Sequence, residues 1–250
     1  MTSPIRQSLL LLLIAILSTN SANALRLPFL SQSPPSNISI TSLDYPNPAT
    51  LKSLSTFFVS AFWSSKTPNP LTPSQKSYLQ KSQTAEFEKR YRFVIDPPPL
   101  TYFGPSTKTL KTAALIQATS SATIAGMVGV EVDDVVVDGA GKSRSVPVLS
   151  NLAIGEEFRR QGIAELLVKR AEQVAGKAPD GTGWGFPDMY LRVEQANKPA
   201  VNLYKKLGYK TEFVDDEATT LVPTDRGVTN KDTVVLVMKK SLKDKKFLFF

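Results

Sequence analysis

The sequence predicts one mixed α/β domain of the α+β kind, in which helices flank a mostly antiparallel sheet. Two observations support this class. Strand patterns joined by short turns are typical of antiparallel hairpins, and strand–helix–strand units follow them in the middle of the chain. With 250 residues and 42% hydrophobic content, the chain is also long enough to bury a full core. We assign residues 38–240 to this domain.

The first part of the domain predicts a strand and two helices. Residues 38–45 are rich in β-branched side chains and form the expected first strand. Helices are expected at 47–63 and 72–91, because each segment opens with a capping residue followed by proline. Residues 96–107 carry too many prolines for regular structure, so we expect a loop there.

Three strands follow. The patterns at 113–120 and 123–137 are separated by only two residues, which indicates a hairpin. The dipeptide Asp138-Gly139 is a second hairpin signal. The apolar run at 146–154 is the third strand.

The last part alternates helices and strands. A helix is expected at 164–175, a strand at 189–194 and a second helix at 197–208, where glycine ends the pattern. Strands at 209–216 and 233–240 complete the domain.

The composition excludes several kinds of chemistry. The sequence contains no cysteine and no histidine, so it lacks thiolate nucleophiles and the commonest general base and metal ligand. We therefore predict no metal site. The net charge is +8, but residues 1–43 and 239–250 carry six of these charges. A basic groove for nucleic acid is not expected.

The stretch "RRQGIA" joins the strand at 146–154 to the helix at 164–175. A glycine-containing loop that opens a helix presents free backbone N–H groups and can bind phosphate. Gly162 permits close approach of the backbone, Ala164 keeps the helix start slim, and Arg159 and Arg160 can add charged contacts. Because many such loops bind nothing, this hexapeptide alone leaves both readings open.

The surrounding residues resemble the GNAT superfamily of acetyl-CoA-dependent N-acetyltransferases. Its acyl-CoA motif, a strand followed by (Q/R)-x-x-G-x-(G/A) and a helix, is similar to "LSNLAIGEEFRRQGIAELLVKRAEQVA". Its second motif, N-x-x-A-x-x-L-Y-x-K-x-G-(F/Y), is similar to "NKPAVNLYKKLGY". The residues of the first motif resemble those of plastid members most. The resemblance implies the GNAT fold, whose mixed sheet has splayed central strands.

The resemblance also implies how acetyl-CoA is held. The backbone at 152–154 would pair with the pantetheine arm, the amides from Arg160 to Ala164 would hold the pyrophosphate, and Asn197 would bond near the pantetheine. The expected cofactor-binding residues are Leu152, Ala153, Ile154, Arg159, Arg160, Gln161, Gly162, Ile163, Ala164, Asn197 and Tyr204.

Tyr204 is the implied acid, which would protonate the leaving thiolate. A tyrosine pKa of about 10 is close to that of a thiol, so this transfer is feasible. The alternative is a core tyrosine on a helix that faces the sheet.

The sequence offers two candidates for the base that removes the amine proton. Family members often carry Glu or His on the strand at 189–194, at the position of Arg192, which cannot accept a proton. Glu194 on the same strand face and Glu131 on an earlier strand are the candidates. Each could equally be a solvated strand charge.

The predicted function is direct acetyl transfer to a primary amine in a ternary complex, since no cysteine can form an acetyl-enzyme. We expect a protein or peptide acceptor in preference to a small molecule. The alternatives are a non-catalytic CoA-binding or interaction module and a secreted small-amine acetyltransferase.

The N-terminal residues are typical of a targeting sequence. An apolar run at 9–17 and the Ala22-Asn23-Ala24 site indicate a signal peptide at 1–24, too short to span a bilayer. Residues 25–37 are acid-free and transit-like. Together they resemble the bipartite presequence of algal plastids, with secretion or an endomembrane lumen as the alternative. Residues 241–250 form a basic and apolar tail, and no membrane span is expected in the mature protein.

Overall fold

The computed structural model describes residues 37–43, 46–63, 66, 69–91, 113–136, 143–177, 183–224 and 227–243. The strands in this part of the chain are β1 (Ile38–Leu43), β2 (Ala113–Ser120), β3 (Thr123–Val136), β4 (Ser143–Ile154), β5 (Asp188–Glu194), β6 (Lys210–Asp215), β7 (Thr219–Thr224), β8 (Gly227–Asp232) and β9 (Val235–Ser241). The helical elements are α1 (Pro48–Phe58), the π-helical turn η1 (Val59–Trp63), α3 (Pro73–Tyr91), the 3-10 turn η2 (Glu156–Phe158), α4 (Ile163–Ala175) and α5 (Lys198–Lys206).

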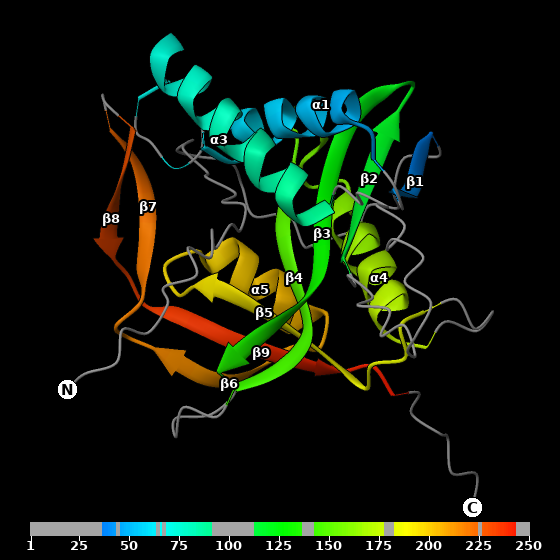
Figure 1. The fold of residues 1–250 in the computed structure, drawn as a ribbon. Coiled ribbons are helices and arrows are strands. Elements are labelled where there is room, and N and C mark those ends of the chain that lie inside the picture. Colours follow the sequence, from blue (N-terminus) through cyan, green and yellow to red (C-terminus); the bar gives the residue numbers. More distant parts are fainter. Residues whose placement is uncertain are drawn as a thin grey trace, which may run out of the picture.

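Seven strands form one sheet in the order β1-β2-β3-β4-β5-β9-β6 (Figure 1). The neighbours pair antiparallel except β4 and β5, which run parallel. This parallel pair is short, because its register covers only Val148–Tyr190 and Leu149–Leu191. The arrangement confirms the predicted mixed, mostly antiparallel sheet with splayed central strands.

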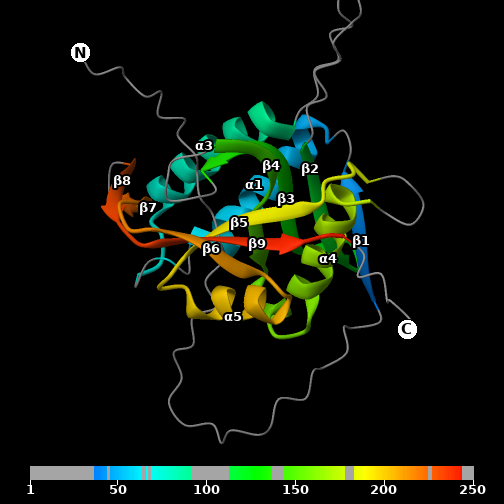
Figure 2. The same cartoon turned by 90° about the horizontal axis from the view of Figure 1, so that it is seen from below.

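Helices cover both faces of the sheet. Figure 2, seen from below, shows α4 and α5 on the opposite side of the strands from α1 and α3. Side-chain alternation in β2 reflects this: Leu115 belongs to the core beneath α1 and α3, and Ile116 to the core beneath α4. β2 therefore supplies side chains to two hydrophobic cores.

The helix predicted at 47–63 is two elements. Asn47 caps α1 by accepting a hydrogen bond from the Thr50 amide at 2.8 Å. The α-helix ends at Phe58, and the wider turn η1 follows. Ala61, Phe62 and Trp63 are all buried there, and a regular helix would not turn three such neighbours toward one core.

The two-stranded hairpin of β7 and β8 was not predicted. It pairs Thr219–Thr224 with Gly227–Asp232 and forms its own sheet between β6 and β9 in the chain. Its first strand contains Pro223 and its second is largely polar, so neither shows the apolar alternation of a half-buried strand. The hairpin lies beside α3, where Gln75 Nε2 donates to the Thr224 carbonyl at 3.0 Å (Figure 1).

Several predictions fall on residues that the structure does not describe. They are the signal peptide, most of the transit-like segment, the loop at 96–107, the Asp138-Gly139 turn and residues 244–250. Among the described residues of the predicted tail, Ser241 ends β9 and the Leu242 amide donates to the Pro187 carbonyl at 2.8 Å. Within the described ranges, no helix combines the length and apolarity needed to cross a membrane.

Candidate active site

The site is built where β4 and β5 separate. Beyond Leu149 and Leu191 the two strands have no paired residues, while β4 stays paired with β3 as far as Ile154. The backbone of residues 150–154 therefore has no strand partner on its β5 side. An unpaired strand edge of this kind can accept an extended amide-containing ligand as an added strand.

A β-bulge marks the point of separation. Gly129 pairs with Ser150 and Met127 with Ala153, so β4 carries one extra residue over this interval. Within the bulge, Asn151 has a φ of 54°, a left-handed conformation that asparagine tolerates better than most residues. The bulge bends β4 away from its parallel neighbour.

Tyr91, at the end of α3, packs on this bulge. Its hydroxyl lies 3.3 Å from Ser150 Oγ and accepts a hydrogen bond from Asn151 Nδ2 at 3.1 Å. A Cβ added at Gly129 would lie 2.2 Å from the same hydroxyl, so glycine is required there. Burial raises the pKa of Tyr91. This network was not predicted from the sequence, although the polar pair Ser150-Asn151 inside an apolar strand was a visible signal.

The loop after β4 leads into α4. Arg160 and Gly162 both have left-handed backbones, with φ values of 67° and 76°. No side chain caps α4 at Gly162, and the first intrahelical bond runs from the Leu166 amide to the Gly162 carbonyl at 3.2 Å. The amides of residues 163–165 thus precede the hydrogen-bonded part of the helix, as an anion site requires.

Several loop side chains are already engaged. Arg159 donates from Nη2 to the Ala61 carbonyl at 3.0 Å and from Nε to the Ile154 carbonyl at 3.3 Å. Gln161 Nε2 donates to the Glu157 carbonyl at 2.9 Å, and the Ile163 side chain is buried in the core. These side chains stabilise the loop conformation. A ligand would therefore contact the backbone of these residues.

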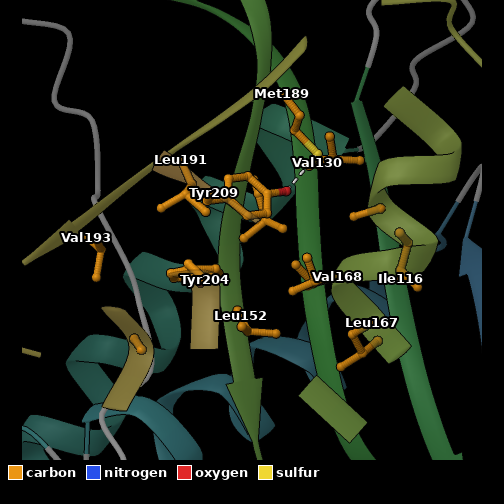
Figure 3. Packing of buried hydrophobic residues seen from close by; sticks show 14 of the residues in the cluster. Ile116, Val130, Leu152, Leu167, Val168, Met189, Leu191, Val193, Tyr204 and Tyr209 are labelled. Atoms are coloured by element: carbon orange, nitrogen blue, oxygen red, sulfur yellow. Dashed lines mark hydrogen bonds between the residues drawn. The ribbon is translucent and has the colours of Figure 1, made fainter. Parts of the chain in front are cut away.

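Tyr204 of α5 lies on the opposite side of the strand opening from Tyr91. Figure 3 shows its ring between β4 and β5, among Leu152, Leu191 and Val193 of the same core. Its hydroxyl is fully buried and has no hydrogen-bond partner among the described residues. Burial raises the pKa of Tyr204.

Tyr209 offers a contrast within the same core. Its ring packs edge-on against Tyr204 at 5.8 Å, and its hydroxyl donates to Met189 Sδ at 3.5 Å (Figure 3). A buried hydroxyl without a partner costs about 1–3 kcal/mol. The Tyr204 hydroxyl is therefore the kind of group that a ligand is expected to complete.

Asn197 begins α5 just after β5. It is buried, and its Oδ1 accepts a hydrogen bond from the Ala200 amide at 3.2 Å. Asn197 thereby fixes the start of the helix that carries Tyr204.

The two candidate bases lie in separate ion pairs. The Glu131 carboxylate is bound by Arg90, which also contacts Glu86. Burial raises the pKa of Glu131, and the attraction of Arg90 opposes this rise. A carboxylate whose pKa is raised is better suited to accept a proton near neutral pH.

Glu194 ends β5 in a compact polar cluster. Its Oε1 accepts from Lys66 Nζ at 2.6 Å and from Thr220 Oγ1 at 2.8 Å. The Lys66 side chain is only 5% exposed, and its Nζ also lies 5.0 Å from the centre of the Phe62 ring. Neither Lys66 nor Thr220 was recognised from the sequence, because long-range pairing brings them to Glu194.

Arg192 of β5 is partly buried, and this burial lowers its pKa despite the nearby carboxylates of Asp133, Asp215 and Glu131.

A mixed sheet whose parallel pair opens beside an uncapped helix is the architecture of the acyl-CoA N-acyltransferase fold. The chain belongs to the acetyltransferase (GNAT) family of acyltransferases, whose sequence profile matches residues 74–209, more than half of its length.

Curated relatives match part of the chain. GCN5-related N-acetyltransferases 7 and 4, chloroplastic, of Arabidopsis thaliana are 32% and 33% identical over 78 and 95 residues, which cover 31% and 38% of this chain. An N-alpha-acetyltransferase of Sulfurisphaera tokodaii is 35% identical over 60 residues, or 24% of this chain. The matched stretches span only 26%, 29% and 33% of these three relatives.

Solved structures share the fold. Arabidopsis thaliana NAA60 in complex with a bisubstrate analogue has a TM-score of 0.50 at 14% identity, covering 82% of this chain and 100% of that one. A putative phosphinothricin N-acetyltransferase has a TM-score of 0.50 at 15% identity, with the same coverage.

Proposed function

We propose that this protein is an N-acetyltransferase that moves the acetyl group of acetyl-CoA to a primary amine by direct transfer. One observation carries the proposal: the opening between β4 and β5 has an uncapped helix start at one end and, beside it, the buried Tyr204 hydroxyl, which has no hydrogen-bond partner among the described residues. Membership of the family supports the same reading.

Acetyl-CoA would supply an activated acetyl thioester, and the chain's residues would hold it. The amides from Arg160 to Ala164 suit the pyrophosphate, because two left-handed residues and a helix start turn N–H groups outward. The free edge at 152–154 suits the amides of the pantetheine arm. Arg159 would act on the loop's shape through the Ala61 and Ile154 carbonyls.

Tyr204 would act as the general acid. As the C–N bond forms and the C–S bond breaks, the departing thiolate needs one proton, which the Tyr204 hydroxyl can donate. Burial raises the Tyr204 pKa, so the proton stays on the tyrosine until a strongly basic group develops next to it.

The amine must lose one proton in the same reaction, and Glu131 is the favoured acceptor. Its raised pKa supports this role, and a water molecule could relay the proton. Glu194 is the alternative, held by Lys66 and Thr220.

A protein or peptide amine is the favoured acceptor. A relative named N-alpha-acetyltransferase supports this choice. The decisive experiment incubates the purified protein with acetyl-CoA and peptide N-termini, lysine peptides or polyamines, and measures CoA release and product mass. Acetyl-CoA binding without turnover on any amine would favour the non-catalytic binding module.

For location, we propose the plastid of an alga, reached through the signal peptide at 1–24 and the transit-like segment at 25–37. The names of two relatives include "chloroplastic". A fluorescent protein fused to residues 1–45 should accumulate in plastids, and its appearance in the medium or the endomembrane lumen would favour secretion instead.

A further inference from the structure

Arg192 lies at the opening of the strands, on the face opposite Tyr204. It follows Leu191, the last β5 residue that pairs with β4. Leu191 and Val193 point into the core that contains Tyr204 (Figure 3). Because side chains alternate along a strand, Arg192 points to the other face. Its β9 partner Val237 packs on that face.

Among the described residues, the Arg192 guanidinium makes no direct ion pair or hydrogen bond, although the carboxylates of Asp133, Asp215 and Glu131 attract it from a longer range. This separates it from Arg90 and Lys66, which are paired directly with Glu131 and Glu194. Removing a guanidinium from water without hydrogen bonds is costly. The three carboxylates recover only part of this cost, because the pKa of Arg192 is still lowered by burial.

We expect the acceptor amine to approach from this same face. If Tyr204 protonates the thiolate from one side of the opening, the side where Arg192 lies is left for the amine. A planar guanidinium binds a carboxylate through two parallel hydrogen bonds and so fixes its orientation.

We propose that Arg192 binds a carboxylate of the acceptor and selects amines that carry a carboxylate close to the reacting nitrogen. The inference rests on the proposed acetyl transfer and adds the substrate class. Two sources share this chemistry: a peptide whose first residue is acidic, and a free amino acid.

The experiment compares matched acceptors. One pair consists of peptides that differ only in glutamate or glutamine at the first position, and the other of free alanine and alaninamide. We expect kcat/KM to be at least tenfold higher for the carboxylate member of one pair, and the pair that shows this identifies the source. Arg192→Gln should remove the preference, and Arg192→Lys should keep part of it.

A matched control is Arg144→Gln, which removes an exposed arginine at the start of β4 and should leave the preference unchanged. Thermal midpoints and acetyl-CoA affinity test for a structural role. Because the guanidinium makes no direct ion pair with the described residues, Arg192→Gln should lower the midpoint little, whereas loss of a structural ion pair would lower it clearly.

Two outcomes overturn the inference while leaving the proposed function intact: a parent enzyme that acetylates the neutral members of both pairs equally well, or a preference that survives in Arg192→Gln. Failure of the parent to acetylate any amine removes the proposed function, and the inference falls with it.

Discussion

Asn151 Nδ2 donates a hydrogen bond to the Tyr91 hydroxyl at 3.1 Å, and this contact joins α3 to the bulge of β4. The bulge lies where β4 leaves β5. A side chain from one face of the sheet therefore maintains the strand separation on which the proposed cofactor site depends.

Tyr91→Phe should destabilise the protein by about 1–3 kcal/mol, because Asn151 and Ser150 lose a buried partner. Gly129→Ala should also cost about 1–3 kcal/mol, since its Cβ would lie 2.2 Å from the Tyr91 hydroxyl. In the Tyr91→Phe background the closest contact is removed, and the next ones lie at 3.0 Å or more, so Gly129→Ala should cost at least ~1 kcal/mol less. Urea denaturation of the four proteins measures this difference, and additive costs would show that the hydroxyl does not contact Gly129.

Gly162→Ala should weaken acetyl-CoA binding at least tenfold, because the new Cβ strains a backbone at φ 76° and alters the loop amides. Gly185→Ala is the matched control. Gly185 has a similar φ of 82° and nothing within 4 Å of an added Cβ. Both variants should lose roughly 1–2 kcal/mol of stability, but only Gly162→Ala should lose affinity by calorimetry. Equal affinities would exclude the loop from cofactor binding.

Glu131→Gln should lower kcat by about 10²- to 10⁴-fold if Glu131 is the base. The parent rate should rise with pH through an apparent pKa above the ordinary glutamate value, because burial raises the pKa of Glu131. The variant should lack this limb. Glu194→Gln is the comparison. If Glu194→Gln lacks the pH-dependent rise in rate and Glu131→Gln keeps it, the base is Glu194.

Because three tyrosines are buried, we expect the free energy of unfolding to fall at alkaline pH. Burial raises the pKa of Tyr91, Tyr204 and Tyr209, whereas an unfolded tyrosine ionises near pH 10. The unfolded state loses these protons first, so their stabilisation is complete below about pH 10 and declines as pH rises further. Denaturation between pH 8 and 11.5 should show a steeper fall for the parent than for Tyr204→Phe. Parallel curves would mean that Tyr204 ionises as readily in the fold as outside it.

Most of the fold could be predicted from the sequence, because hydrophobic periodicity and capping signals are local. The strand at Ala113–Ser120 has the predicted bounds, and α4 differs by a single residue from the predicted 164–175. The π-helical turn at Val59–Trp63 could not be predicted, since it arises where successive residues are all drawn into one core. The β7–β8 hairpin was also not predictable, because its residues do not alternate between apolar and polar along the sequence.

For a related reason, only some residues of the candidate site could be identified from the sequence. Gly162, Asn197 and Tyr204 belong to contiguous motifs, so the sequence could identify them. Tyr91 and Lys66 act through residues far away in the chain, at Asn151 and Glu194. Pairings of this kind depend on tertiary packing and leave no local pattern.

The most direct test of the proposed chemistry is kcat for Tyr204→Phe, measured beside the parent and Tyr209→Phe. The Tyr204 hydroxyl has no partner within the described chain, so its removal should leave the thermal midpoint and acetyl-CoA affinity unchanged or slightly higher. Tyr209→Phe removes a hydroxyl bonded to Met189 Sδ and should keep its rate within threefold of the parent. We predict that kcat of Tyr204→Phe falls by about 10²- to 10⁴-fold. A rate within threefold of the parent would contradict the role of Tyr204 as the acid.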